Sequence, residues 1–294
     1  MTSASYPMIG SNSKRILLVS KTPLLQRVEP GVLARLAGGG AVDVERLRAA
    51  AANHEKALHL VRRALGAHRV SEFQVDRLQA RDADGKDLVV TVGGDGTVLT
   101  TNSLESDLPL ITVNSDPEGS VGMYARCTAD SFAGLFQGWL AGTAQIETIP
   151  RLLVRIDSGN PWRILNECLF ASANPAAMSR YVLECDGRRE EQRSSGVWVA
   201  TAAGSTAAIR SAGMEPVEAH VPALLYQVRE PFHGRREMNL LSGRQLPPVG
   251  LKLMPAMPGI SMFIDGPHLH RTVPPGATVE FTPCPTPLRL VRAP

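Results

Sequence analysis

A short glycine-rich segment carries the strongest chemical signal in the sequence. It follows an apolar run, Leu88 to Val92, and reads Gly93-Gly94-Asp95-Gly96-Thr97. Glycine lets a ligand approach the backbone closely, and backbone N–H groups in a turn that opens a helix suit a phosphate. A carboxylate in this position can accept a proton from a hydroxyl or organise Mg²⁺. A plain turn between a strand and a helix is the alternative, but the whole pentapeptide after a strand favours a functional site.

Two later segments place polar or small residues where a ligand could reach them. Asn166 and Glu167 are neighbours inside a strand-like run, so their side chains should point to opposite faces. Taken alone, this pair is more typical of an ordinary strand edge. The other segment, Thr201 to Ala207, combines small residues with hydroxyls after another strand-like run. Such a turn can let the backbone approach a flat ligand, or it can be a plain capped helix start.

The elements that must position these residues follow two different patterns of secondary structure along the chain. Up to about residue 145, apolar runs alternate with helical patterns, of which the clearest are Val44 to Ala67 and Ala129 to Ala141. The strand candidates in this part are Ile16–Val19, a strand marked by Phe73 and Val75, Leu88–Val92 and Leu110–Val113. Strands that alternate with helices predict a Rossmann-like α/β domain with a mostly parallel sheet.

After Gln145 the strand candidates follow one another with short turns, and one helix is expected near Thr206–Ala212. The candidates are Glu147–Ile156, Trp162–Ala171, Arg180–Asp186, Gln192–Thr201, Ala223–Val228, Val249–Met254 and Ile260–Ile264. Asp186-Gly187 between two such runs is a hairpin signal. The pattern predicts an antiparallel β-sandwich. We therefore expect domains at 1–145 and 146–272, followed by a Pro-rich tail at 273–294.

Composition narrows the class of protein. A length of 294 residues suggests two domains or one large one. A net charge of +3 does not favour nucleic acid or an anionic membrane as the main partner. No apolar run approaches the ~18–20 residues that span a bilayer. The four cysteines lack CxxC spacing, so a structural zinc site has no support and no protein metal site is expected. Scattered thiols fit a reducing cytoplasm.

Taken together and in order, the three motifs resemble those of the NAD kinase family. The order is GGDGT, then Asn-Glu, then Gly-Ser-Thr-Ala, and the resemblance runs from about Arg15 to Gly266. Diacylglycerol and sphingosine kinases also carry GGDGT, and phosphofructokinases a shorter form, but lipid kinases lack this arrangement of the other two motifs. The likeness is closest to the mitochondrial-type branch and its bacterial relatives. The residues that carry it are Lys21-Thr22, Val113 to Glu118 with Ser120 and Gly122, Ser194-Ser195-Gly196 and Val228 to Pro231.

The resemblance implies an α/β N-terminal domain, a C-terminal β-sandwich and a tail that returns to the first domain. It also implies transfer of the terminal phosphoryl of ATP, or of polyphosphate, to the adenosine ribose 2′-hydroxyl of NAD. Mg²⁺ would accompany ATP, and the family implies a homodimer. By match to the family's motifs, Asp95 would be the general base, and phosphates would meet Gly93, Gly94, Gly96 and Thr97. The NAD-binding residues would be Asn166, Glu167, Thr206, Ala207 and Ser211.

Some positions depart from the family pattern and keep two alternatives open. Many NAD kinases have an aromatic residue where this chain has Ala208, and the usual Gly-Phe is replaced by Gly122-Met123-Tyr124. The mitochondrial-type branch usually has Lys where this chain has Thr206. One alternative is a GGDGT-type kinase of another hydroxyl substrate, such as a lipid. The other is a non-catalytic NAD(P)-binding sensor. Asp265-Gly266 matches a late Asp-Gly of the family, but is also a typical hairpin turn.

Overall fold

The computed structural model describes residues 13–232, 234 and 238–294. The chain divides into two compact units, each with its own core. The first unit comprises the described residues up to Leu104 together with Leu108–Glu147 and Leu290–Pro294. The second unit comprises Glu105–Asp107 and Thr148–Arg289. The chain passes from the first unit to the main part of the second at Glu147–Thr148. Among the described residues, no helix is both long and apolar enough to cross a membrane.

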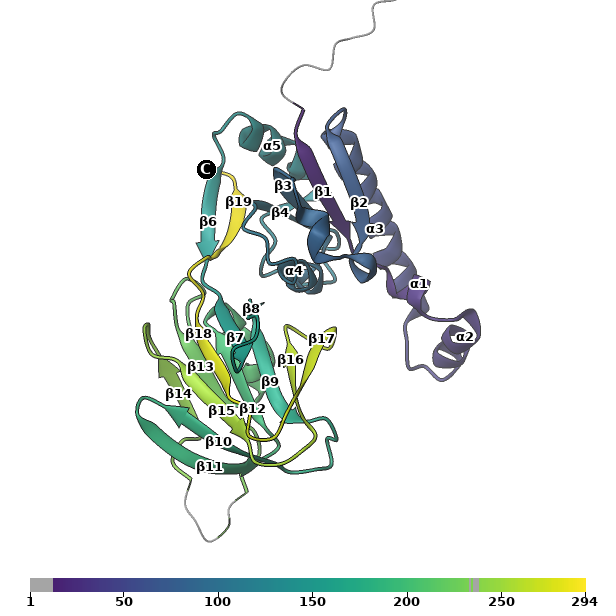
Figure 1. The fold of residues 1–294 in the computed structure, drawn as a ribbon. Helices are drawn as coiled ribbons and strands as arrows, with labels where there is room; N and C mark the ends of the chain where they lie inside the picture. Colours follow the sequence, from purple (N-terminus) through teal and green to yellow (C-terminus); the bar gives the residue numbers. More distant parts are fainter. Residues whose placement is uncertain (1–12, 233, 235–237) are drawn as a thin grey trace, which may run out of the picture. The chain divides into compact units, whose positions relative to one another are not determined.

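A parallel sheet organises the first unit (Figure 1). Its strands β1 (Arg15–Ser20), β2 (Arg69–Gln74), β3 (Leu88–Gly93) and β4 (Leu110–Asn114) pair in the order β2-β1-β3-β4. β3 and β4 are buried along their whole length, which is why they read as apolar runs in the sequence. β4 also pairs with β5 (Cys127–Thr128) and with β19 (Leu288–Arg292), and β6 (Gln145–Ile149) follows β19.

Helices cover the sheet of the first unit. The long helix α3 (Val44–Leu65) packs against α5 (Ala129–Leu140) over the sheet, with Val61 and Phe136 fully buried. α4 (Asp95–Asn102) follows β3 directly. Because parallel crossovers are right-handed, the connections β1-α3-β2 and β3-α4-β4, which run in opposite directions along the sheet, place α3 and α4 on opposite faces. The remaining helical segments are α1 (Leu24–Arg27), α2 (Pro30–Gly38), η1 (Val75–Arg77) and η2 (Ala80–Ala83).

The described residues of the second unit form two six-stranded sheets whose pairings are antiparallel. One sheet has the order β11-β10-β15-β18-β7-β8, and its strands are β7 (Leu152–Ile156), β8 (Trp162–Ile164), β10 (Ser179–Cys185), β11 (Arg188–Ser194), β15 (Leu251–Pro255) and β18 (Val279–Pro283). The other has the order β14-β13-β12-β9-β16-β17, and its strands are β9 (Glu167–Ser172), β12 (Val197–Thr201), β13 (Leu224–Val228), β14 (Ser242–Gln245), β16 (Ile260–Ile264) and β17 (Leu269–Val273).

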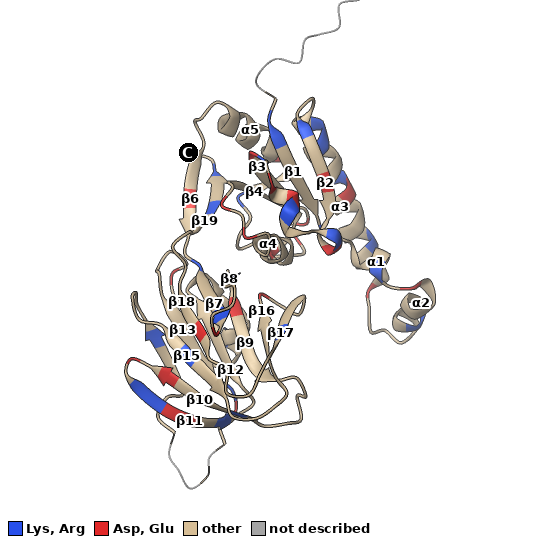
Figure 2. Cartoon of the chain, viewed as in Figure 1, with Lys and Arg blue, Asp and Glu red and all other residues tan. Residues whose placement is uncertain are grey.

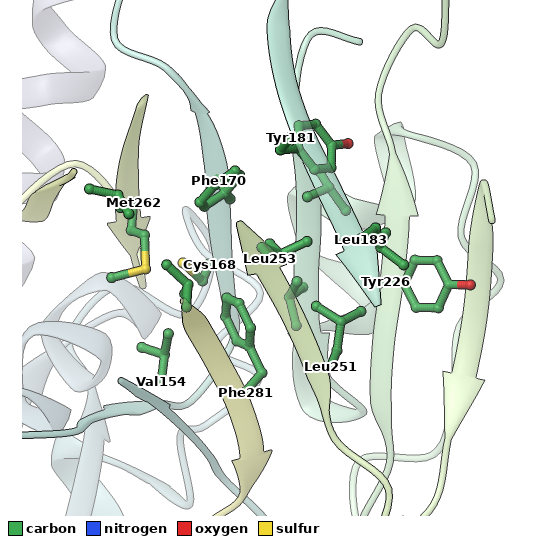
Figure 3. Close-up of a cluster of buried hydrophobic side chains, with 14 of the residues drawn as sticks. Val154, Cys168, Phe170, Tyr181, Leu183, Tyr226, Leu251, Leu253, Met262 and Phe281 are labelled. Atoms are coloured by element: carbon green, nitrogen blue, oxygen red, sulfur yellow. The ribbon is translucent and has the colours of Figure 1, made fainter. Parts of the chain in front are cut away.

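Alternate residues of both sheets build the core of the second unit. Cys168 and Phe170 of β9 belong to the same buried cluster as Leu251 and Leu253 of β15 and Phe281 of β18, and Figure 3 shows these side chains among the strands. Spacing of two along each strand places such residues on one face, which is the pattern of a sandwich. The predicted α/β domain followed by a β-sandwich is therefore confirmed.

The hairpin predicted at Asp186-Gly187 is present. Cys185 of β10 pairs with Arg188 of β11, and the two residues between them have positive φ angles of 51° and 70°. Both central residues of a type I′ turn need this conformation. β11 is the edge of its sheet, and Figure 2 shows basic and acidic residues following one another along it. Charged edges of this kind resist pairing with another sheet.

Several element predictions were wrong in their boundaries. The single strand expected at Glu147–Ile156 is two strands, β6 and β7, which belong to different sheets. The run Gln192–Thr201 breaks at Ser195-Gly196, where Gly196 has a φ of 106°. Val75 lies in η1 and not in a strand. The two strand breaks fall at Pro150-Arg151 and at Ser195-Gly196, and proline and glycine commonly interrupt strands. The predicted strands ran through these residues because apolar residues lie on both sides of Pro150-Arg151 and follow Gly196 directly.

Two further differences concern the helix of the second unit and the tail. The helix expected at Thr206–Ala212 is two short segments, η3 (Ala203–Thr206) and α6 (Ala208–Ser211). The tail expected at 273–294 is divided. β18 lies between β15 and β7 inside a sheet of the second unit, whereas β19 pairs with β4 in the first unit.

Candidate active site

The glycine turn lies at the carboxyl end of β3, where α4 begins. Gly93 is the last residue of β3, Gly94 is the N-cap of α4 and Asp95 opens its first turn. A Cβ added to Gly93 would collide with the side chain of Thr97, so this close approach requires glycine. The N–H of Thr97 donates to the carbonyl of Gly94 at 3.0 Å, which closes the turn. The turn therefore presents the start of a helix, where N–H groups and the helix dipole favour an anion.

The carboxylate of Asp95 is held by the backbone of a second loop. The N–H of Met123 donates to Oδ2 at 3.0 Å, and the N–H of Tyr124 donates to Oδ1 at 2.9 Å. Gly122, with a φ of 63°, lies in the turn just before these donors. Each carboxylate oxygen can accept more than one hydrogen bond, so the half-buried group keeps acceptor capacity for a further hydroxyl. Because the donors are backbone groups, the replacement of the usual Gly-Phe by Gly122-Met123-Tyr124 does not remove these bonds.

Asn166 and Glu167 lie at a break between two strands. β8 ends at Ile164 and β9 begins at Glu167, so the prediction that both residues lie inside one continuous strand was wrong. The buried carboxylate of Glu167 accepts the N–H of Ala208 at 3.1 Å and that of Ile209 at 3.0 Å. Burial raises the pKa of Glu167 above its ordinary value, and the two N–H donors partly oppose that rise. Glu167 therefore ties the Asn-Glu pair to the start of α6.

Asp265 fixes the backbone of the Asn-Glu pair from the loop between β16 and β17. Its carboxylate accepts the N–H of Leu165 at 2.9 Å, of Asn166 at 2.7 Å and of Glu167 at 3.2 Å. Three successive N–H groups that converge on one carboxylate form an anion-binding concavity. Asp265 is thus a turn residue, with a φ of 49°, that also holds the Asn-Glu pair in place. The Asp265-Gly266 sequence predicted the turn, but it could not predict this contact, because the donors lie about a hundred residues away in the chain.

The Gly-Ser-Thr-Ala segment packs directly on the Asn-Glu pair. A Cβ added to Gly204 would collide with the backbone carbonyl of Asn166. The hydroxyl of Thr201 donates to the carbonyl of Leu165 at 2.6 Å and accepts the N–H of Gly204 at 3.0 Å. This hydroxyl therefore joins the two segments, and glycine is the residue that lets their backbones meet.

The remaining predicted residues of this segment differ in exposure. The fully buried hydroxyl of Ser205 donates to the carbonyl of Val217 at 3.1 Å and accepts its N–H at 2.9 Å, so it holds the loop after α6. Thr206 and Ser211 are exposed, and Ala207 is partly exposed. Small or exposed groups at 206, 207 and 211 leave this surface open to a flat ligand.

The predicted site residues fall into two groups, each assembled inside its own unit. Gly93, Gly94, Asp95, Gly96 and Thr97 are consecutive in the first unit. Asn166, Glu167, Thr206, Ala207 and Ser211 belong to the second unit, where hydrogen bonds and close packing join the Asn-Glu pair to the segment 201–209. Among residues 13–232, 234 and 238–294, no group of three or more His, Cys, Asp or Glu side chains could hold a metal ion.

Solved structures share this fold. Yeast NADH kinase complexed with NADH matches with a TM-score of 0.71 and 16% identity over 97% of this chain and 85% of that chain. An NAD kinase from Archaeoglobus fulgidus in complex with ATP matches with a TM-score of 0.65 and 18% identity over 94% of this chain and 93% of that chain. The architecture is therefore that of the NAD and NADH kinases.

Sequence comparisons identify the family. Residues 42–144 match the model of the ATP-NAD kinase N-terminal domain. A probable NADH kinase of Oryza sativa subsp. japonica is 29% identical over 256 residues, which are 78% of this chain and 78% of the relative. An NAD kinase of Methanoregula boonei is 33% identical over 197 residues, which are 66% of this chain and 69% of the relative. The chain belongs to the NAD kinase family.

Proposed function

We propose that this protein is an NAD kinase that transfers the terminal phosphoryl of ATP, or of polyphosphate, to the adenosine ribose 2′-hydroxyl of NAD. The observation that carries the proposal is the carboxylate of Asp95, which two backbone N–H groups hold at the end of the glycine turn. A ribose hydroxyl is a poor nucleophile. A positioned carboxylate that accepts its proton is worth roughly 10²–10⁴-fold in rate.

The glycine turn is assigned to the phosphates of the donor. The N–H groups at the start of α4 lie beside Asp95, so a phosphate bound there would be next to the base. Mg²⁺, bound with ATP, would neutralise charge on the transferred group. The described residues fit this arrangement, because Mg²⁺ that enters with ATP is held largely by substrate phosphates and water and needs no cluster of protein ligands.

The second unit is assigned to the acceptor. Asn166 and Glu167 would hydrogen-bond the adenosine part of NAD, with Thr206 and Ala207 near the adenine and Ser211 alongside. The support is the fixed backbone of the Asn-Glu pair and its packing on Gly204. Buried polar groups of this kind reject an acceptor that lacks the matching hydroxyls. A cytoplasmic homodimer completes the proposal and follows from the family resemblance and the scattered thiols.

The direct test is phosphorylation of NAD by purified protein. With γ-labelled ATP and Mg²⁺, label should enter NADP when NAD is the acceptor, and diacylglycerol or sphingosine should stay unlabelled. Labelled lipid in place of NADP would overturn the assignment in favour of a lipid kinase. Binding of NAD without any transfer of label would show that the protein is a sensor.

Variants of the Asn-Glu pair test the assignment of the acceptor. Glu167→Gln places an amide NH₂ against one of the two N–H donors of α6, and Asn166→Asp adds a second negative charge beside Glu167. Charge-assisted hydrogen bonds contribute ~1.5–3 kcal/mol, so kcat/KM for NAD should fall by about tenfold or more in each variant. The apparent affinity for ATP should change less.

Steady-state kinetics with each substrate varied in turn give the readout. An ordinary strand edge would leave both variants close to wild type. If the apparent affinity for ATP falls while KM and kcat/KM for NAD stay unchanged, the pair belongs to the donor site instead.

A further inference from the structure

Lys21 lies at the point in the first sheet where the strand order reverses. The connection from β1 runs toward β2, while β3 and β4 extend in the opposite direction, so the carboxyl ends of β1 and β3 flank a topological switch point (Figure 1). In open α/β sheets, ligands bind in the crevice outside such a point. Gly93 closes β3 on one side, and Lys21 directly follows β1 on the other.

The backbone of Lys21 is fixed against the glycine turn. Its N–H donates to the carbonyl of Val92 at 3.0 Å, and a Cβ added to Gly93 would lie 3.2 Å from the Cβ of Lys21. The side chain of Lys21 therefore starts beside the same turn that presents the N-terminus of α4 and Asp95. A lysine side chain carries a compact charge on a flexible stem, which suits a phosphate.

The charge of Lys21 is only partly compensated in the protein. Burial lowers the pKa of Lys21, and the carboxylate of Asp116 partly opposes that effect. Asp116 does not interact with Lys21 alone, because its Oδ1 also accepts a hydrogen bond from the side chain of Asn53 at 3.1 Å. Burial, followed by the charges of Lys21 and Arg62, lowers the pKa of nearby His54 to about 4, so this histidine is neutral at pH 7. An anion at the end of β1 would thus gain a half-buried cation whose charge the protein compensates only in part.

Two buried hydroxyls flank this position. The Oγ1 of Thr22 and the Oγ of Ser115 have no hydrogen-bond partner among the described residues. Thr22 follows Lys21 at the end of β1, and the N–H of Ser115, at the end of β4, donates to the carbonyl of Gly93 at 3.0 Å. Because β1 and β4 both pair with β3, the two residues lie on either side of the end of β3. Buried hydroxyls without a partner are uncommon and point to a ligand or a catalytic role.

The other lysine near these strand ends has a different environment. Exposed Lys56 of α3 borders a cavity of about 310 Å³ that is also lined by Asp116, Glu118 and Asp130. Ser115 lines this cavity as well, so Lys56 is near the strand ends, but three carboxylates surround it and compete with a phosphate for its charge. Lys21, beside the helix start and one shared carboxylate, is the better placed of the two cations.

We propose that Lys21 binds the phosphates of the nucleoside triphosphate donor, with the hydroxyls of Thr22 and Ser115 as further donors to the phosphoryl oxygens. This inference rests on the proposed function, since it assigns the donor site of the same reaction. Lys21 is a binding residue here. Asp95 remains the base, and the acceptor is held by the second unit.

The test compares Lys21→Met, which removes the charge at similar length, with Lys21→Arg, which keeps it. Lys56→Met is the matched control. Binding of a non-hydrolysable ATP analogue with Mg²⁺ is measured by calorimetry, alongside KM for ATP and for NAD. Lys21→Met should weaken analogue binding and raise KM for ATP about tenfold or more, with KM for NAD within about twofold of wild type. Lys21→Arg should recover part of the loss, and Lys56→Met should match wild type.

A second measurement uses the wild-type protein alone, so it does not depend on folding of a variant. Acylation of Lys21 by an amine-reactive reagent, followed by mass spectrometry, should be suppressed by the ATP analogue while acylation of Lys56 continues. Unchanged analogue binding in Lys21→Met, or acylation of Lys21 without protection, would overturn the inference. If analogue binding depends on Lys21 but wild type makes no NADP, the proposed function fails and the donor site stands. If wild type makes NADP and Lys21→Met binds the analogue normally, the donor-site inference alone fails.

Discussion

Asp95→Asn is expected to lower kcat for NADP formation by about 100-fold or more while NAD still binds. An amide cannot accept the proton of the ribose hydroxyl, although it has nearly the same shape as the carboxylate. The substitution also places an NH₂ group against one of the two backbone donors, Met123 or Tyr124. Loss of one such bond costs ~1 kcal/mol, which the fold should tolerate. The measurements are initial rates, NAD binding at equilibrium and thermal unfolding.

The matched control for this variant is Asp130→Asn. Asp130 is likewise an acidic residue in the first turn of a helix, α5, but it is exposed. Its amide variant should keep the wild-type rate, which separates loss of a general base from loss of helix-dipole stabilisation. If Asp95→Asn keeps more than a tenth of the wild-type kcat, Asp95 does not act as the base.

The glycine turn could be predicted from the sequence because its signals are local. An apolar run ends, glycines follow and a helical pattern begins, all within ten residues of Leu88. The partners of the site could not be predicted in the same way. Asp95 is held by the N–H groups of Met123 and Tyr124, and any residue type can supply a backbone N–H. No side-chain pattern marks such donors, so their part in the site is visible only in the fold.

In the second unit too, strands could be predicted from the sequence, but contacts between residues far apart in the chain could not. Alternating apolar residues predicted its central strands, because each of these buries one face in the sandwich. The edge strand β14, with the sequence Ser-Gly-Arg-Gln, has no such alternation and was not predicted. The break at Leu165-Asn166 was also missed, since it is set by Asp265 and Thr201 from distant parts of the chain. The Asn-Glu pair was found through the family resemblance, and its geometry depends on these remote contacts.

Gly204→Ala is expected to disable the acceptor half of the site. The added Cβ would lie 2.5 Å from the carbonyl carbon and 2.8 Å from the Cα of Asn166, and closer still to its carbonyl oxygen. The backbone of Asn166 cannot move away freely, because Asp265 binds its N–H at 2.7 Å and the N–H of Thr201 binds its carbonyl at 2.9 Å. Overpacking of this kind costs ~1–3 kcal/mol. We therefore expect the free energy of unfolding to fall by that amount and KM for NAD to rise about tenfold or more.

Gly134→Ala provides the control, because a Cβ at this position of helix α5 meets nothing within 4 Å. Alanine in a helix is more favourable than glycine by ~0.5–1 kcal/mol, so this variant should be as stable as wild type or more stable, with unchanged kinetics. Denaturant unfolding and steady-state kinetics of both variants give the comparison. Binding of the ATP analogue, which is assigned to the first unit, should persist in folded Gly204→Ala. Should Gly204→Ala match wild type in both stability and KM for NAD, the contact between Gly204 and Asn166 would not position the acceptor, and the Asn-Glu pair would have to act independently of the segment that follows β12.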